Sequence, residues 1–172
     1  MVMRRKAQSR PKGLPLIVLA NILCPMQIRP AERKDIPQIV QLCAWHAEYE
    51  MADFDPDNKE QLLAEHLFDK SNQIRCLVAE EDDRLIGYAT FIKQFSTWDA
   101  DYYLYLDCLY LMENHRGKGW GTKIMNRIKE HALSENCPAI QWQTPVFNTK
   151  AIDFYRKLGA ESKTKERFTW FV

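Results

Sequence analysis

A glycine-rich turn between a strand-like run and a helix-like run constrains the fold of this chain more than any other feature. The turn reads Arg-Gly-Lys-Gly-Trp-Gly over residues 116–121 and follows residues 102–112, which are rich in Tyr and Leu. The apolar residues after the turn recur at helical spacing: Ile124, Met125, Ile128 and Ala132. Glycine adopts positive φ and lets the backbone approach a ligand closely. Because N–H groups at a helix start lack internal partners, the turn predicts an anion site, to which Arg116 and Lys118 add charge.

Two well-known phosphate loops do not fit this turn. A Walker loop requires Ser or Thr directly after the lysine, whereas Lys118 is followed by Gly119. A dinucleotide-binding fingerprint spaces its glycines differently and begins at a first strand. Taken alone, the turn is also compatible with a purely structural role as a tight turn and helix cap.

The elements before the turn are two helices and a meander of strands. Asp35 as an N-cap opens an amphipathic helix that ends near Glu50, and a short strand at 27–29 precedes it. Asp57 and Glu60 form a capping-box pattern for a second helix that reaches Phe68. The runs that read as strands come next: 76–80, 85–94 and 102–112.

After the helix that follows the turn, the pattern predicts strand, helix and strand. Residues 139–144 read as a strand, and Asn148 caps a last helix that stops at Gly159. A final strand is expected at 167–172. This order indicates an α/β fold, with a mixed sheet that carries helices on its faces.

Length favours one domain, because the chain has 172 residues. We expect an upstream extension or disordered tail at residues 1–25 and a domain at 26–172, with Met26 as the natural start. The apolar run 14–23 is too short for a membrane-spanning helix and contains Pro15. These features predict a cytoplasmic protein without a membrane partner.

Charge and cysteine usage narrow the function further. The chain has 24 Lys plus Arg against 23 Asp plus Glu, a formal net charge of +1, so no nucleic-acid partner is predicted. The five cysteines are scattered without a two-residue gap, and there are only four histidines. We therefore expect no metal site and read the cysteines as reduced thiols that serve as small core residues.

Two motifs together resemble the GCN5-related N-acetyltransferase (GNAT) superfamily. They are Arg-Gly-Lys-Gly-Trp-Gly at 116–121 and the segment 148–160, which combines Asn148, an aromatic pair and a terminal glycine. The resemblance runs from about Met26 to the C-terminus. It implies a mostly antiparallel, twisted sheet, splayed at the acetyl-CoA site and flanked by about four helices. It also implies acetyl-CoA as cosubstrate and a homodimer. Within the superfamily, residues 47–50, 104–107 and 148–160 are similar to the polyamine-type (spermidine/spermine) acetyltransferases.

The resemblance assigns residues to acetyl-CoA. Backbone N–H groups of the strand before the turn would hold the acetyl carbonyl and the pantetheine arm, and the turn would take the pyrophosphate. Tyr155 matches the tyrosine that protonates the CoA sulfur; alternatively, Tyr155 is a residue at the edge of the core. Asn148 caps its helix and, with Ala151, contacts the cofactor arm. The remaining predicted contacts are Leu109, Tyr110, Leu111, Arg116, Gly117, Lys118, Gly119, Trp120, Gly121 and Thr122.

Attack on a thioester requires a neutral amine, yet an alkyl amine has a pKa of about 10, so its proton must be accepted by the enzyme. Asp107 is the candidate base, because burial among Tyr and Leu would raise its pKa. The polyamine-type pattern has Glu followed by Asp, whereas this chain has Asp107 followed by Cys108. The shorter side chain favours a water relay, and a structural hydrogen-bond acceptor is the alternative.

The acceptor amine would be cationic before it reacts, so acidic and aromatic residues are candidates for binding it. Glu48, Glu50 and Asp107 are the acidic candidates, and Trp98 represents the aromatic residues of the 96–101 loop and of the following strand. Each acidic residue is alternatively a solvated charge, and each aromatic residue a packing residue of the sheet.

Three functions remain open at this point. The preferred one is an acetyl-CoA-dependent N-acetyltransferase that acts directly on a primary amine of a small molecule, such as a polyamine or diamine. The second is acetylation of a protein N-terminus or lysine, which requires an extended peptide groove. The third is a non-catalytic module that binds or senses acyl-CoA.

Overall fold

The computed structural model describes residues 26–69 and 73–172 of the chain. The expectations for the segment 1–25 therefore lie outside the described residues. No helix within the described ranges is long and apolar enough to cross a lipid bilayer.

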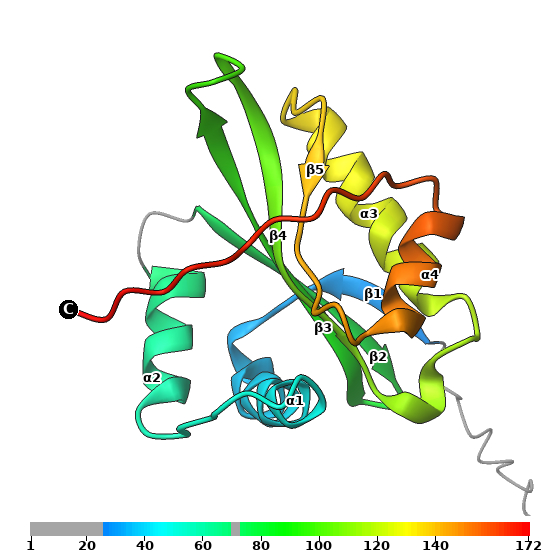
Figure 1. The fold of residues 1–172 in the computed structure, drawn as a ribbon. Coiled ribbons are helices and arrows are strands. Elements are labelled where there is room, and N and C mark those ends of the chain that lie inside the picture. The colour runs from blue at the N-terminus through cyan, green and yellow to red at the C-terminus, as the bar shows by residue number, and fades with distance from the viewer. Residues whose placement is uncertain (1–25, 70–72) are drawn as a thin grey trace, which may run out of the picture.

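A five-stranded sheet with the strand order β1-β2-β3-β4-β5 forms the centre of the fold (Figure 1). Neighbouring strands run antiparallel from β1 to β4, and only the β4–β5 pair is parallel. The bounds of the strands are β1 Gln27–Pro30, β2 Ile74–Glu81, β3 Arg84–Ser96, β4 Asp101–Leu111 and β5 Ile140–Gln141. The predicted mixed α/β sheet, mostly antiparallel, is confirmed.

Four α-helices cover the sheet. They are α1 Ile36–Tyr49, α2 Lys59–Ala64, α3 Trp120–Ser134 and α4 Thr149–Lys157. Three short helical turns add to them: η1 Arg33–Asp35, η2 Glu65–Asp69 and η3 Glu113–His115. The predicted strands 76–80 and 85–94 agree with β2 and β3 within two residues at each end. The predicted helices that begin at 36 and 149 agree with α1 and α4 in the same way.

The sheet separates two hydrophobic clusters because successive strand residues point to opposite faces. Val78 and Tyr88 pack with Ile39 and Leu42 of α1, whereas the next residues along their strands, Ala79 and Ala89, pack with α3. Phe154 and Leu158 of α4 join the α3 side. The site described below lies where α1 and α4 meet across the open edge of β4 (Figure 1).

Of the two predicted helix caps, Asp35 is confirmed as the N-cap residue of α1 but makes no capping bond with its side chain, and Asp57 is wrong. Asp35 precedes α1, but its buried carboxylate binds Arg29 at 2.6 Å instead of capping that helix. Helix α2 begins after Asn58, whose φ of 59° is left-handed, and Asp57 instead donates its amide to the Asp55 carboxylate. For Asp35, the charged Arg29 competes successfully for the side chain that would cap the helix.

The last two strands differ from the prediction. Strand β5 covers only Ile140–Gln141 of the expected 139–144. The segment 161–172 forms neither helix nor strand, so the predicted strand at 167–172 is wrong. Its aromatic residues are almost fully exposed, and Figure 1 shows the segment crossing the molecule toward α2. The composition of residues 167–172 suits a strand, but a strand also requires a neighbouring edge to which it can bond.

Candidate active site

Strand β4 is interrupted by a β-bulge at Asp107. Thr90 pairs with Cys108 and Phe91 pairs with Leu106, so Asp107 is the extra residue between them. A bulge redirects a side chain and is frequent beside active sites. Asp107 is exposed, contrary to the burial that we expected, because the bulge leaves it uncovered. Burial raises the pKa of Cys43 and Cys108, and the Asp107 carboxylate adds to both shifts. Burial lowers the pKa of His46, and the Asp107 carboxylate opposes that shift.

One edge of β4 is open beyond the bulge. Strand β5 pairs with β4 only at Leu104 and Tyr105, so the two strands splay apart after that point. The Met112 amide donates to Ile86 of β3 at 2.8 Å. Because amides alternate sides along a strand, those of Leu109 and Leu111 point to the open side, and that of Tyr110 points to β3. The two leucine amides are therefore available to a ligand.

The glycine-rich turn presents the backbone N–H groups that the sequence predicted. Gly117 and Gly119 have φ of 74° and 85°, and Gly119 is the N-cap of α3. The first intrahelical bond runs from the Lys123 amide to Gly119 O at 3.1 Å. The amides at the helix start, including those of Trp120, Gly121 and Thr122, thus lack helical acceptors. The Arg116 amide is different, because it already donates to Glu113 O at 3.1 Å.

Gly121 has a packing role rather than the positive φ that we expected. It lies inside α3, where an added Cβ would be 3.0 Å from Cζ of Phe154 on α4. The third glycine of the motif therefore allows α3 and α4 to approach closely. That approach fixes the position of α4 relative to the turn.

The Arg116 side chain lies beside α1. Its Nε donates to Leu111 O at 2.7 Å, and its Cζ lies 4.2 Å from the ring centroid of Tyr49 and 5.4 Å from that of Tyr110. Arg116, Tyr49 and Tyr110 line a pocket of about 270 Å³, which we call the α1 pocket; its other lining residues are Trp45, Glu48 and Glu113. The Arg116 guanidinium, which was predicted to bind the pyrophosphate, is thus partly engaged by Leu111 and Tyr49. The Lys118 side chain is exposed.

Helix α4 begins with the predicted cap. The Asn148 Oδ1 accepts from the Ala151 amide at 3.3 Å and from the Tyr49 hydroxyl at 3.0 Å. Asn148 is buried, so this one oxygen joins the start of α4 to the end of α1. Gly159, with φ of 87°, ends the helix in the left-handed conformation as expected.

Tyr155 is half-buried on α4 and faces the end of α1. Its ring packs on Trp142, with the centroids 5.0 Å apart. Burial raises the pKa of Tyr155 to about 12, and the Glu50 carboxylate contributes in the same direction. The phenol therefore stays protonated at neutral pH and can donate a proton.

The end of α1 carries a second polar group. His46 Nδ1 lies 3.1 Å from the Tyr88 hydroxyl, its Nε2 lies 3.5 Å from Glu50 Oε1, and its ring stacks on Tyr110. Burial lowers the pKa of His46, and Glu50 opposes this shift. His46 is therefore neutral at neutral pH and lies beside Glu50, whose carboxylate also acts on the pKa of Tyr155.

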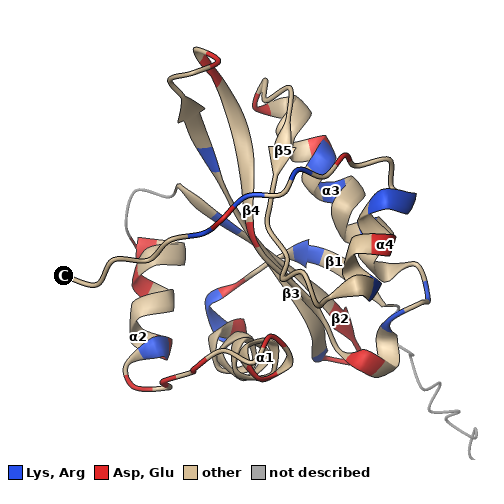
Figure 2. Ribbon diagram, in the orientation of Figure 1, with Lys and Arg blue, Asp and Glu red and all other residues tan. Residues whose placement is uncertain are grey.

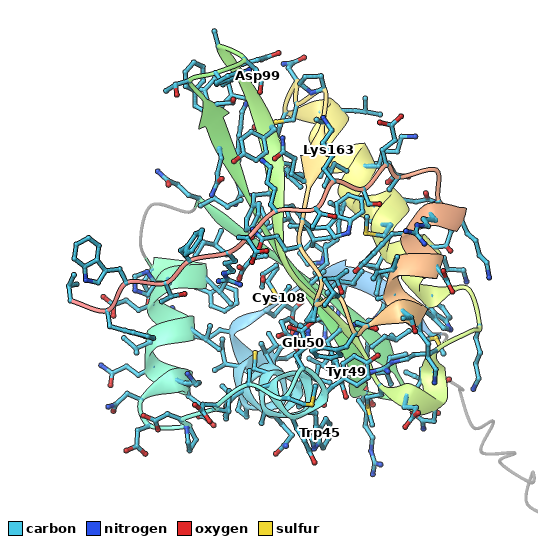
Figure 3. All side chains as sticks on the ribbon, in the orientation of Figure 1. Trp45, Tyr49, Glu50, Asp99, Cys108 and Lys163 are labelled. Carbon is cyan, nitrogen blue, oxygen red and sulfur yellow. The ribbon has the colours of Figure 1, made fainter. Side chains whose placement is uncertain are left out.

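Sequence reasoning found most of this arrangement and missed part of it. Figure 3 shows Tyr49 and Glu50 together at the end of α1, with Asp99 far away at the tip of the β3–β4 hairpin. Trp98 belongs to that tip and is 95% exposed, so the structure does not bring it to the site. His46 and Tyr49 were missed. The four-residue spacing of His46 and Glu50 on a helix was the available signal.

Acidic residues gather at the end of α1 and on the segment after it, as Figure 2 shows. Glu48 and Glu50 are on different sides of the end of α1: Glu48 lines the α1 pocket, and Glu50 faces His46. The site thus combines free main-chain donors, a protonated phenol and several carboxylates. Such a set can bind an anionic cofactor on one side and a cationic acceptor on the other.

Comparison with known proteins finds acetyltransferases. The thialysine N-epsilon-acetyltransferase of Mus musculus is 30% identical over 147 residues, which cover 81% of this chain and 86% of that protein. The spermidine/spermine N(1)-acetyltransferase-like protein 1 of Homo sapiens is 27% identical over 148 residues, but these are 21% of its length. Among solved structures, an aminoglycoside acetyltransferase, meta-AAC0020, from an uncultured soil metagenomic sample superposes with a TM-score of 0.72. It is 21% identical, and the match covers 86% of this chain and 97% of that one.

A family model described as "Acetyltransferase (GNAT) family" matches residues 39–160, which contain the open strand, the glycine-rich turn and Tyr155. The match extends over more than half of the chain, and the relatives above bear N-acetyltransferase names. This chain therefore belongs to the acetyltransferase (GNAT) family and is an N-acetyltransferase.

Proposed function

We propose that the enzyme transfers the acetyl group of acetyl-CoA directly to a primary amine of a small cationic molecule. The observation that carries this proposal is the placement of three groups around the open edge of β4. The free amides of the turn lie at one end, Tyr155 on α4 faces the end of α1, and Asp107 projects from the bulge. The carboxylates near α1 suit a cationic acceptor.

The proposed reaction assigns a role to each group. The amides of residues 117–122 and the exposed Lys118 bind the diphosphate of CoA, and Asn148 and Ala151 lie along its arm. The amides of Leu109 and Leu111 hold the pantetheine arm and the acetyl carbonyl, where negative charge develops. Tyr110 contributes its side chain rather than its amide, because that amide points to β3.

The proton of the ammonium group must leave before attack, because its pKa of about 10 keeps it charged. The exposed Asp107 accepts it through water, in keeping with its short side chain, and Glu50 holds the cation nearby. The amine nitrogen then forms a bond to the carbonyl carbon, and the C–S bond breaks. Tyr155 donates its phenolic proton to the departing thiolate of CoA, and the second proton that the acylated nitrogen loses restores the phenol through water.

A thiol-release assay with acetyl-CoA tests the proposal across polyamines, diamines, amino acids, aminoglycosides and peptides. We expect release of CoA with small cationic amines and an N-acetylated product of matching mass. Turnover with peptides alone would instead support the second function, acetylation of a protein N-terminus or lysine. Binding of acetyl-CoA without transfer to any amine would leave only the third, a sensing module.

We also propose a cytoplasmic homodimer. The four cysteines in the described ranges are free thiols, which suits a reducing compartment. Phe168, Trp170 and Phe171 are about nine-tenths exposed, which suits a surface that a second copy covers. Sedimentation equilibrium should give twice the chain mass of 20.3 kDa. A single-chain mass at micromolar concentration would contradict the homodimer.

A further inference from the structure

Tyr49, the last residue of α1, joins three parts of the site (Figure 3). Its hydroxyl donates to Asn148 Oδ1 at the start of α4, with 3.0 Å between the two oxygens. Its ring lies under the Arg116 guanidinium, whose Cζ is 4.2 Å from the ring centroid. The proposed reaction assigns no role to Tyr49, although this side chain contacts both the turn and the helix that carry the proposed chemistry.

Helix α4 must be held in a defined orientation, because it carries the proposed proton donor. Phe154 of α4 packs on Gly121 of α3, but an apolar contact has no direction and permits the helix to rotate about its axis. A hydrogen bond does have a direction. Asn148 Oδ1 accepts the Tyr49 hydroxyl at 3.0 Å and the Ala151 amide of its own helix at 3.3 Å. The hydrogen bond from Tyr49 therefore fixes how α4 is rotated toward α1.

Tyr155 lies on the side of α4 that this hydrogen bond fixes. It follows Asn148 by about two turns of an α-helix, so the two side chains leave the helix on the same side. Burial raises the pKa of Tyr155 most, and Glu50 and Tyr49 add to that shift, which places both of them near the phenol. Because Asn148 is buried, water competes poorly for its hydrogen bond with Tyr49. The end of α1 thus acts on the position of the phenol through the start of α4.

The ring of Tyr49 has a different partner, the first residue of the glycine-rich turn. Arg116 donates from Nε to Leu111 O at 2.7 Å while its guanidinium lies on the Tyr49 ring. A cation over an aromatic ring is attracted by the ring itself, so this contact does not need the hydroxyl. The ring therefore holds the residue before Gly117 against the end of β4, beside the amides that the proposed reaction uses.

From these contacts we infer that Tyr49 is a positioning residue with two separable functions. Its hydroxyl holds α4 so that the Tyr155 phenol reaches the sulfur of CoA. Its ring holds Arg116 so that the turn keeps its place beside β4. This role rests on the proposed function, because it requires Tyr155 as the proton donor. It adds that the helix on the acceptor side of the site sets the position of a donor that acts on the cofactor.

Two substitutions separate these functions in the full chain, by thiol release and by calorimetric titration with CoA. Tyr49→Phe removes only the hydroxyl, and we expect kcat to fall at least about 5-fold, the usual effect of one lost hydrogen bond, with the Kd for CoA nearly unchanged. Tyr49→Leu also removes the ring and should in addition raise the Kd for CoA several-fold. Asn148 keeps its bond to the Ala151 amide in both variants, so α4 remains capped.

Tyr103→Phe is the matched control, because it removes a hydroxyl that donates to Gln94 on the β3–β4 hairpin. It should leave both kcat and the Kd for CoA unchanged. An unchanged kcat in Tyr49→Phe would overturn the function of the hydroxyl. An unchanged Kd in Tyr49→Leu would overturn the function of the ring. Both results leave the proposed acetyl transfer standing.

A double-mutant cycle distinguishes positioning from a general loss of stability. If Tyr49 acts through Tyr155, adding Tyr49→Phe to Tyr155→Phe should cause almost no further loss of kcat. Losses that multiply would show that the hydroxyl acts independently of Tyr155, and would overturn the inference alone. An unchanged kcat in Tyr155→Phe would overturn the proposed donor and the inference with it. Absence of transfer to every amine would overturn the proposed function as well.

Discussion

Tyr155 is the residue on which the proposed chemistry depends most. Its half-buried phenol has a pKa of about 12, so it remains protonated throughout the range in which the protein is folded and active. Tyr155→Phe keeps the ring contact with Trp142 and removes only the proton donor. We expect kcat to fall by roughly 10²–10⁴, the usual contribution of general acid catalysis, with the affinity for CoA unchanged.

Steady-state thiol release together with calorimetry separates these two effects. Tyr103→Phe is the control, because it also removes a phenol, one that donates to Gln94 on the β3–β4 hairpin. That variant should keep wild-type turnover. Equal kcat in Tyr155→Phe and wild type would contradict the donor role.

His46 links stability to pH. Burial lowers its pKa below the unfolded value of about 6.5, although Glu50 on its own helix and Asp107 on β4 oppose the shift. Arg116 acts with burial, and the uncharged Tyr88 and Tyr110 complete the surroundings of the ring. The native state therefore binds fewer protons than the unfolded state as pH falls below about 6.5. The free energy of unfolding should decrease from there until pH passes the lowered pKa.

Urea titrations between about pH 5 and pH 8 would show this loss, with a slope of at most about 1.4 kcal/mol per pH unit from one group. His46→Gln should reduce the slope. The pKa of His131 on α3 is also lowered by burial, so His131→Gln should reduce the slope similarly while leaving kcat unchanged. An identical slope in wild type and His46→Gln would contradict the assigned shift.

At the scale of elements, the contact between α3 and α4 places Tyr155 relative to the turn. A Cβ at Gly121 would lie 3.0 Å from Cζ and 3.3 Å from Cε2 of Phe154. Gly121→Ala should therefore lower the free energy of unfolding by about 1–3 kcal/mol, the usual effect of overpacking. Adding Phe154→Leu to Gly121→Ala should restore part of the free energy of unfolding that Gly121→Ala removes.

Chemical denaturation measures these differences. Gly159→Ala is the control, because its φ of 87° causes strain while an added Cβ meets nothing within 4 Å. Phe154→Leu should give that variant no rescue. Equal rescue of both glycine variants would show that helix packing is not the cause.

Local elements were predictable from the sequence, whereas contacts between elements were not. The Asn148 cap and the turn with Gly117 and Gly119 depend on neighbours within a few residues, and both are confirmed. The bulge that exposes Asp107 depends on register with β3, which periodicity does not reveal. Likewise, the contact of Arg116 with Tyr49 joins residues far apart in sequence. Gly121 matched the motif, but its role in the structure is to leave room for the packing of α4 against α3.

At the scale of the whole molecule, the C-terminal segment contributes little to the fold of a single chain. Every residue from 161 to 172 is exposed, and none belongs to a helix or strand. A chain that ends at Ala160 should unfold cooperatively, with a free energy within about 0.5 kcal/mol of the full chain, the usual range for surface changes. These values refer to concentrations at which both chains are monomeric.

A chain that ends at Lys157 is the comparison for urea denaturation. It lacks Leu158, which packs against the α3 cluster, and Gly159, which ends α4. It should be clearly less stable than the chain that ends at Ala160. Loss of cooperative unfolding in the chain that ends at Ala160 would show that 161–172 is part of the monomer core.

The central claim is that main-chain amides of the turn at 117–122 bind the diphosphate of CoA. Calorimetric titration of the full chain with CoA and with pantetheine, which lacks the diphosphate and the nucleotide, tests it most directly. We predict that CoA binds at least about 100-fold more tightly than pantetheine, because the turn and the start of α3 form an anion site. Equal affinities for the two compounds, or no heat with CoA on folded protein, would contradict the claim.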